Sequence, residues 1–313
     1  MMKSYVALMK QSIFICLTAL ILVLFQLIDA FAVVRLLQWA GTLERLAFEA
    51  KGVFDRSQPL LQLGTILTTT LALALVPMLT KAMMEGNIKQ AKSYQTLSYR
   101  LAILVGGAAT VGLVVIIEPT NHFLFTDTAG SNVLRVMSLA ILVASFFSTI
   151  SAVLQGHNYT YLPAIAVGFG VLIKLGCNVI LIPTFGTLGA AWSTVIAASV
   201  MVIFLLLVFH KKKGLHLGSY RSYIPIIVVL AVMGILTFLW KSGLTHLISG
   251  QSRELSALIA LSSAGFGGLI VAFCLFTMKI FTEEEWSHIS KLNKIRVRLN
   301  KWLKYLKGMG GSR

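Results

Sequence analysis

Residues 161–210 read YLPAIAVGFGVLIKLGCNVILIPTFGTLGAAWSTVIAASVMVIFLLLVFH, and among them only Lys174 carries a full charge. A helix of about twenty apolar residues, rising 1.5 Å per residue, crosses the roughly 30 Å of hydrocarbon in a bilayer. The stretch holds two runs of that length, 161–182 and 187–209. We therefore expect two consecutive transmembrane helices here.

The rest of the chain has the same character. Of its 313 residues 57% are hydrophobic and 12% are charged, half the share of about a quarter that a soluble domain needs. We predict an all-α membrane protein whose residues 1–280 form one bundle. Its eight transmembrane helices are expected near 10–34, 58–80, 97–117, 132–155, 161–182, 187–209, 222–240 and 255–279.

Lys and Arg residues fall unequally on the two sides of such a bundle. With both termini in the cytoplasm, 19 of the 27 lie on the inner side and six on the outer side. Because positive charge accumulates on the cytoplasmic side of membrane proteins, this predicts a multi-pass protein of the cell membrane with both termini inside. The net charge of +16 then faces anionic lipid, and a nucleic-acid partner is not expected.

Residues 281–313 are predicted to form a basic amphipathic tail on the cytoplasmic side. Thr282 and Glu285 have the spacing of a capping box at a helix start. Apolar residues then recur every three or four positions, with basic residues between them. Such a helix lies on membrane lipids of the inner leaflet, or docks on another protein.

Lys174 is the residue whose placement in a predicted span costs the most free energy, because it is charged and lies about thirteen residues from the start of the span 161–182. Gly170, Lys174 and Asn178 are four apart, so they share one face of the helix. This stripe is expected to face other helices or a wet cavity. Lys174 then either contacts an anionic ligand or has a structural role, in which it snorkels or bonds to carbonyls.

Three further polar residues are candidates for a cavity. Arg56 stands at the outer entrance of the second span beside Asp55, either as a ligand contact or as an interfacial pair. Gln155 closes the fourth span, and Asp29 lies towards the end of the first. No acidic residue is predicted at mid-span, which disfavours a proton- or sodium-coupled pump and favours an anionic substrate.

Motifs of soluble catalysis do not appear in the chain. It has no phosphate loop, HExxH or GxSxG, and its six histidines are not clustered. We therefore expect no enzyme activity, no catalytic residues, no metal and no cofactor.

Five stretches resemble a known family. They are VLFQLIDAF (23–31), KGVFDRSQPLLQLG (51–64), ALVPMLTKAMMEGN (74–87), LQGHNY (154–159) and IKLGCNVILIPTFGTLGAAWST (173–194). They look like the second half of polysaccharide flippases. These are the stage V sporulation protein B-like group of the multidrug/oligosaccharidyl-lipid/polysaccharide exporter superfamily, related to the lipid II flippases.

The resemblance implies fourteen spans, in two six-helix lobes plus two extra helices around a central cavity. This chain would supply the second lobe and the extra pair of that MATE-like fold. The first lobe would be missing, because the gene is truncated or split, because the sequence starts at an internal Met, or because a separate N-terminal lobe acts as partner. The resemblance also implies that Arg56, and less directly Lys174 and Asn178, contact a diphosphate in the cavity.

The function that we predict is flipping of a polyprenyl-diphosphate-linked oligosaccharide or cell-wall precursor across the bacterial cytoplasmic membrane. The alternatives are a multidrug or cation antiporter of the same superfamily, a membrane-bound glycosyltransferase or ligase, and a fragment without transport activity. An antiporter requires mid-span carboxylates. A transferase requires an acidic pair or a large outward loop, and the longest outward loop, about 35–57, holds few acidic residues.

Overall fold

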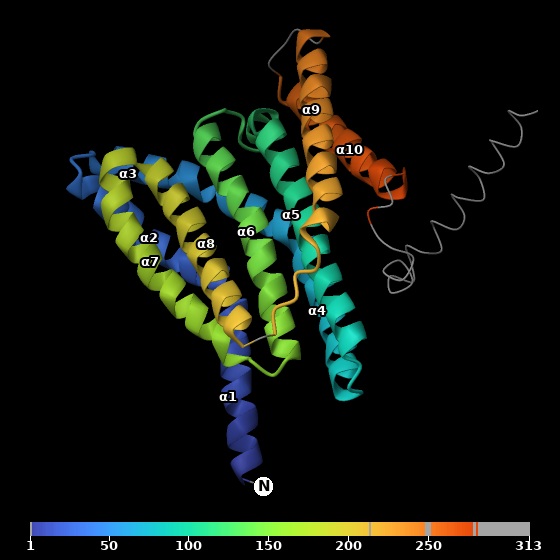
Figure 1. Ribbon diagram of the computed structural model, residues 1–313. Coiled ribbons are helices and arrows are strands. Elements are labelled where there is room, and N and C mark those ends of the chain that lie inside the picture. The colour runs from blue at the N-terminus through green and yellow to red at the C-terminus, as the bar shows by residue number, and fades with distance from the viewer. Residues whose placement is uncertain (1, 213, 248–251, 278–279, 281–313) are drawn as a thin grey trace, which may run out of the picture.

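A computed structural model describes residues 2–212, 214–247, 252–277 and 280. Within these ranges the chain is helical and contains no strand (Figure 1). The amphipathic tail predicted for 281–313 lies outside the described residues. The helices are α1 (Met2–Ala19), α2 (Ile21–Trp39), α3 (Glu44–Asp55), α4 (Ser57–Met84), α5 (Ile88–Phe125), α6 (Ser131–Gly156), α7 (Tyr161–Phe185), α8 (Thr187–Lys211), the 3-10 turn η1 (Tyr220–Ser222), α9 (Ile224–Leu247) and α10 (Arg253–Thr277).

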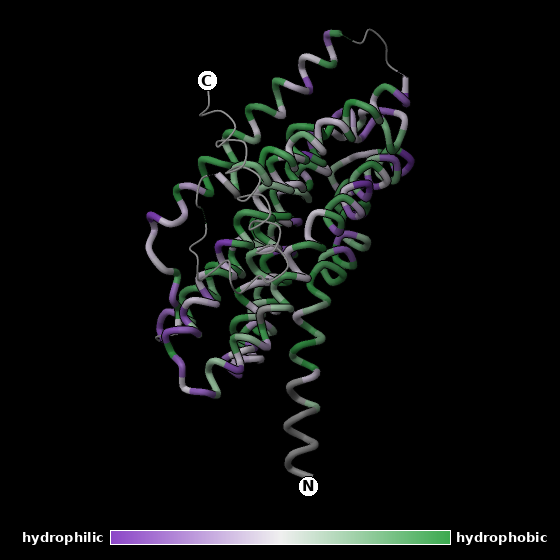
Figure 2. The backbone as a smooth tube through the Cα atoms, turned by 90° about the vertical axis from the view of Figure 1, so that its right-hand side faces the viewer, coloured by the Kyte–Doolittle hydropathy of each residue, from purple (hydrophilic) through white to green (hydrophobic). Residues whose placement is uncertain are grey.

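In the described part of the chain, eight helical stretches are long and apolar enough to cross a membrane. The fold class and the number of spans predicted from the sequence are thereby confirmed. Figure 2 shows the corresponding pattern, in which the hydrophobic colour runs along the helices and the hydrophilic colour gathers at their ends and turns. The protein is a multi-pass membrane protein.

Two features near the N-terminus differ from the prediction. The first apolar run is a bent pair of helices rather than one, because α1 ends at Ala19 and α2 begins at Ile21. The segment predicted as a loop at 35–57 contains the helix α3, which crosses one end of the bundle (Figure 1). Ala47 and Phe54 are the buried residues of α3 and fix it against the bundle.

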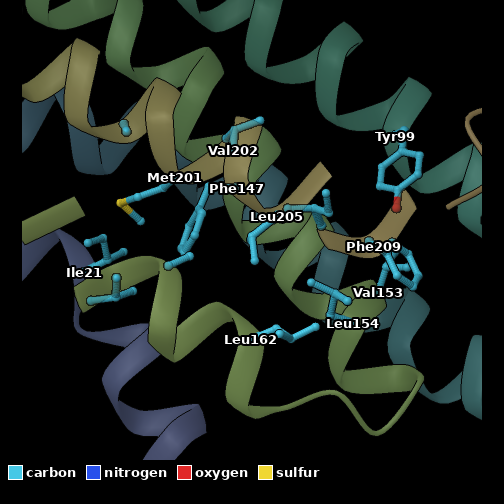
Figure 3. Packing of buried hydrophobic residues seen from close by; sticks show 14 of the residues in the cluster. Ile21, Tyr99, Phe147, Val153, Leu154, Leu162, Met201, Val202, Leu205 and Phe209 are labelled. Atoms are coloured by element: carbon cyan, nitrogen blue, oxygen red, sulfur yellow. The ribbon is translucent and has the colours of Figure 1, made fainter. Parts of the chain in front are cut away.

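The bundle has two ends. The N-terminus and the α4–α5, α6–α7 and α8–α9 connections lie at one, which we call the N-terminal side (Figure 1). The opposite side holds α3 and the α5–α6 and α7–α8 turns. Tyr99, Phe147, Leu205 and Phe209 belong to the largest cluster of buried apolar residues, which joins α5, α6 and α8 (Figure 3).

The contact between α7 and α8 depends on a glycine. A Cβ added at Gly189 would lie 2.1 Å from the backbone oxygen of Leu181, so only a residue without a side chain fits. The turn between the two helices is made by Gly186, whose φ of 62° is a left-handed conformation that favours glycine. Small residues at crossings let transmembrane helices approach closely.

In the α9–α10 hairpin, basic side chains donate hydrogen bonds to backbone carbonyls of α5. Pro119 lacks an N–H, which leaves the carbonyl of Val115 without its usual helical donor. Lys241 Nζ of α9 donates to that oxygen at 3.2 Å, and Arg253 Nε of α10 donates to the carbonyl of Phe123 at 2.8 Å. The contact of Arg253 lies in the last turn of α5, where the helix dipole favours positive charge.

Candidate functional site

A buried ion pair joins α2 to α7. Lys174 Nζ lies 2.9 Å from Asp29 Oδ1, and the side chains are 0% and 2% exposed. Lys174 also donates to Thr194 Oγ1 of α8 at 2.7 Å, and its ammonium lies 5.2 Å from the centre of the Phe25 ring. The ammonium therefore has a carboxylate, a hydroxyl and an aromatic face around it, with no access to water.

Asn178 extends this network. Its Nδ2 donates to Asp29 Oδ1 at 3.1 Å, and its Oδ1 accepts a hydrogen bond from the hydroxyl of Ser193. Gly170, Lys174 and Asn178 are all buried, so the stripe predicted on α7 faces other helices rather than lipid. We call Asp29, Lys174, Asn178, Ser193 and Thr194 the buried polar network. Because its charges and hydrogen bonds are paired, it can persist in a low-dielectric interior.

Asp29 corrects the prediction that no carboxylate lies at mid-span. The first span was expected to end near residue 34, whereas α2 continues to Trp39 and places Asp29 near its middle. The buried residues of α2 are four apart, and Asp29 takes the central place in their stripe: Ile21, Phe25, Asp29, Val33 and Leu37. That spacing is a signal that the sequence already contained.

Arg56 occupies a separate site on the opposite side. Its guanidinium donates two hydrogen bonds to the carboxylate of Asp127, from Nη1 to Oδ1 at 2.6 Å and from Nη2 to Oδ2 at 2.9 Å. Arg56 also lies 4.8 Å from the Phe125 ring. Of the two alternatives left open for Arg56, the pair with its neighbour Asp55 is not formed, since Asp55 pairs with Lys51.

Asp127 lies in the α5–α6 turn and was not anticipated from the sequence. The hydrogen bond from Arg56 lowers the pKa of this carboxyl below its usual range, and a backbone hydrogen bond from Ala129 acts in the same direction. Arg56 and Asp127 are 71 positions apart in the sequence. No local sequence pattern indicates that the α5–α6 turn packs beside the start of α4. The contact depends on tertiary structure alone.

Gln155 lines a groove between α1, α2, α4 and α6, with a volume of about 260 Å³. We call it the hydroxyl groove, because its polar lining consists of Thr18, Thr65, Thr69, Ser148, Ser151 and Gln155. None of the described residues that line it is charged. The structure thus brings Asp29, Lys174 and Asn178 together, but places Arg56 and Gln155 in two other places.

A second groove, of about 560 Å³, runs between α4, α5, α6, α9 and α10. Leu60, Leu67, Leu113 and Leu261 are among its lining residues, and we call it the apolar groove. Its polar residues carry hydroxyls only, and those of Thr120, Thr237 and Ser263 have no hydrogen-bond partner. Different residues of α4 line the two grooves: Thr65 and Thr69 line the hydroxyl groove, whereas Gly64 and Leu67 line the apolar groove.

Metal-ligating residues do not gather in the described ranges. No group of three or more His, Cys, Asp or Glu residues occurs there.

Comparison with known proteins gives a consistent result. The model of a family described as lipid II flippase MurJ matches residues 54–256. The chain is 36% identical over 299 residues to the uncharacterized membrane protein YabM of Bacillus subtilis (strain 168), which covers 93% of this chain and 55% of that protein. The resemblance seen in the sequence is thereby confirmed at the level of the family.

Two further relatives come from the same organism. Lipid II flippase MurJ is 27% identical over 227 residues, covering 69% of this chain and 41% of that protein. Stage V sporulation protein B is 24% identical over 242 residues, covering 76% of this chain and 45% of that protein. The chain spans about half the length of the curated relatives that it matches.

The fold has a solved counterpart. The crystal structure of MATE in complex with MaD5 aligns with a TM-score of 0.54 at 16% identity, covering 91% of this chain and 70% of that one. This likeness shows that the described helices have a MATE-like fold.

Proposed function

Because the chain belongs to the lipid II flippase MurJ family of membrane transporters, we propose that it takes part in flipping a lipid-linked glycan or cell-wall precursor. The substrate would be a polyprenyl-diphosphate-linked oligosaccharide, and the membrane the bacterial cytoplasmic membrane. Both termini would be cytoplasmic, as the excess of Lys and Arg on that side favours. The chain would supply the second of two lobes.

The observation that carries this proposal is the pair of grooves on either side of α4. A lipid-linked glycan has an apolar chain and a polar head joined by a short linkage. The apolar groove is lined almost entirely by hydrocarbon, whereas the hydroxyl groove offers hydrogen-bonding groups. The helix α4 thus separates the apolar groove, which suits the lipid's apolar chain, from the hydroxyl groove, which suits its polar head group.

Arg56 and Lys174 as diphosphate contacts stay a prediction. Each is already paired with a carboxylate, Asp127 and Asp29 respectively, so a phosphate would have to displace that partner. Exchange is easier at Arg56, because Asp127 is 46% exposed while Asp29 is enclosed. A guanidinium is also the better fit for phosphate, since its planar donors match two oxygens at once.

The test is a flipping assay in membrane vesicles from the cells that make the protein, with the gene present or deleted. The probe is a fluorescent polyprenyl diphosphate that carries N-acetylglucosamine, and its movement is followed by quenching from outside the vesicle. We expect deletion to slow movement of this probe and to leave fluorescent phosphatidylcholine unaffected. Equal rates for the glycan probe in both vesicles would contradict the proposal.

One observation favours the second candidate, an antiporter for drugs or cations. Asp29 is the buried carboxylate that such a transporter needs and that the sequence was not expected to provide. Its partner Lys174 already neutralises it, which disfavours this alternative. If the protein is an antiporter, the original chain will show ethidium efflux driven by a sodium or proton gradient, and Asp29→Asn will abolish it. If the protein is a flippase, the original chain will show no such efflux.

A further inference from the structure

The hydroxyl groove lies where the first helix pair bends. Thr18 and Ala19 end α1 and Ile21 begins α2, and all three line the groove. The groove floor includes Ile21 and Phe147, whose side chains lie in the core shown in Figure 3. The groove is thus lined by the end of α1 and the start of α2 together with α4 and α6.

Among the residues that the structure describes, no charged side chain lines the groove to hold a phosphate. Its lining contains no Lys, Arg, Asp or Glu, and Arg56 and Lys174 lie in other contacts. A phosphate group taken from water into such a place would lose its hydration without gaining a cation. An anionic group is therefore the wrong occupant for this groove.

Its hydrogen-bonding groups are nevertheless available. Ser151 is 2% exposed, and its hydroxyl is buried without a partner. Within the described part of the chain, the side-chain amide of Gln155 makes no hydrogen bond either. Thr18, Thr65 and Thr69 donate to carbonyls of their own helices, which leaves their oxygen lone pairs free to accept.

This inventory matches an uncharged polyol. Ser151 and Gln155 offer donors, the three threonines offer acceptors, and sugar hydroxyl and acetamido groups present both kinds. Phe147 and Leu22 give the apolar surface that the C–H faces of a sugar ring need. The volume of about 260 Å³ is near the lower end of small-molecule pockets, so one ring fits rather than a whole oligosaccharide.

We propose that the hydroxyl groove binds an uncharged sugar ring of the lipid-linked substrate, with Ser151 and Gln155 as its hydrogen-bond partners. This inference rests on the proposed function and adds to it which part of the substrate this lobe recognises. The lobe recognises the glycan, and the diphosphate is held elsewhere.

The test measures binding to the purified full chain in lipid nanodiscs with two probes. One is an isoprenyl diphosphate carrying a single N-acetylglucosamine, and the other is the same isoprenyl diphosphate without sugar. The variants are Ser151→Ala and Gln155→Leu. Ser199→Ala is the control, because its hydroxyl donates to Val195 of its own helix and lies outside the groove.

We expect Ser151→Ala and Gln155→Leu each to weaken binding of the sugar-bearing probe about fivefold to tenfold, the usual effect of one lost hydrogen bond. Binding of the sugar-free probe should not change, and Ser199→Ala should match the original chain with both. Equal affinity of the original chain for the two probes, or equal weakening of both by the variants, would overturn the inference while leaving the proposed function intact. Failure of the original chain to bind either probe would overturn both.

Discussion

Lys174 and Asp29 are two full charges enclosed between α2, α7 and α8. Removing one partner of such a pair leaves the other as an uncompensated buried charge, which costs roughly 3–5 kcal/mol. We expect Lys174→Met and Asp29→Asn each to lower the thermal unfolding temperature of the detergent-solubilised protein strongly. The measurement is fluorescence-detected size-exclusion after heating.

The double variant is the control for this prediction. Asp29→Asn with Lys174→Met removes both charges at nearly constant volume, so it should recover most of the lost stability. If the single variants unfold at the same temperature as the original chain, the pair is not buried as the structure shows. If the double variant is no better than either single one, the loss comes from packing rather than from charge.

Arg56 and Asp127 give a prediction with a pH dependence. Arg56 lowers the pKa of Asp127, so the folded state favours the carboxylate. The stabilisation is therefore fully present above the unfolded pKa of about 3.9 and is lost as the pH falls through the lowered value. The effect is small, because Asp127 is about half exposed and solvent screens the pair.

Asp127→Asn isolates this contribution. The original chain should unfold at a somewhat higher temperature than the variant at pH 6, and the difference should shrink as the pH is lowered below about 4. Thermal scans of both proteins from pH 6 to pH 3 measure it. A constant difference over that range would mean that Asp127 does not pair with Arg56 in its ionised form.

Whether a residue of the site can be predicted from the sequence depends on how far apart in the chain the contacting residues lie. The burial of Lys174 and Asn178 was predictable, because both lie on one helix and their four-residue spacing fixes the shared face. Asp29 was missed through a five-residue error in the end of one span. Asp127 and Thr194 could not be found, since their contacts join separate helices and no local periodicity reports such contacts.

At the scale of the helices, Gly189 tests the close crossing of α7 and α8. Gly189→Ala would place a Cβ against the backbone of Leu181, which cannot move aside as a flexible side chain can. Overpacking of this kind typically costs 1–3 kcal/mol or more. We expect a lower unfolding temperature and a smaller yield of monodisperse protein.

Gly176 provides a matched control in the same helix pair. A Cβ added there meets nothing within 4 Å, so Gly176→Ala should leave the unfolding temperature unchanged or raise it slightly. Equal behaviour of the two variants would mean that α7 and α8 do not cross at Gly189.

Helix number and type followed from apolar length, because a bilayer leaves a chain few alternatives to helices that satisfy their own backbone hydrogen bonds. The bend at Leu20 and the helix α3 were not predicted. Hydropathy reports how apolar a run is, but not where a neighbouring helix makes it bend. Residues on both sides of this bend line the hydroxyl groove.

At the scale of the whole molecule, we propose that one transmembrane lobe holds the isoprenyl chain and the head group of a lipid-linked glycan on opposite faces of α4. The residues that line the hydroxyl groove come from four helices and those that line the apolar groove from five, so their mutual positions depend on how these helices pack. Sequence resemblance indicated the family and its MATE-like architecture, but neither groove could be located from the sequence.

The most direct measurement is photo-crosslinking with an isoprenyl diphosphate N-acetylglucosamine that carries a diazirine at the end of its isoprenyl chain, followed by peptide mapping. Leu67 and Leu261 of the apolar groove are 63% and 64% exposed, and Leu172 and Ile180 outside it are 66% and 69% exposed. Because the exposures match, random contact with lipid would label all four alike. We expect adducts concentrated at Leu67 and Leu261. Equal labelling of Leu172 and Ile180 would mean that the isoprenyl chain does not occupy the apolar groove.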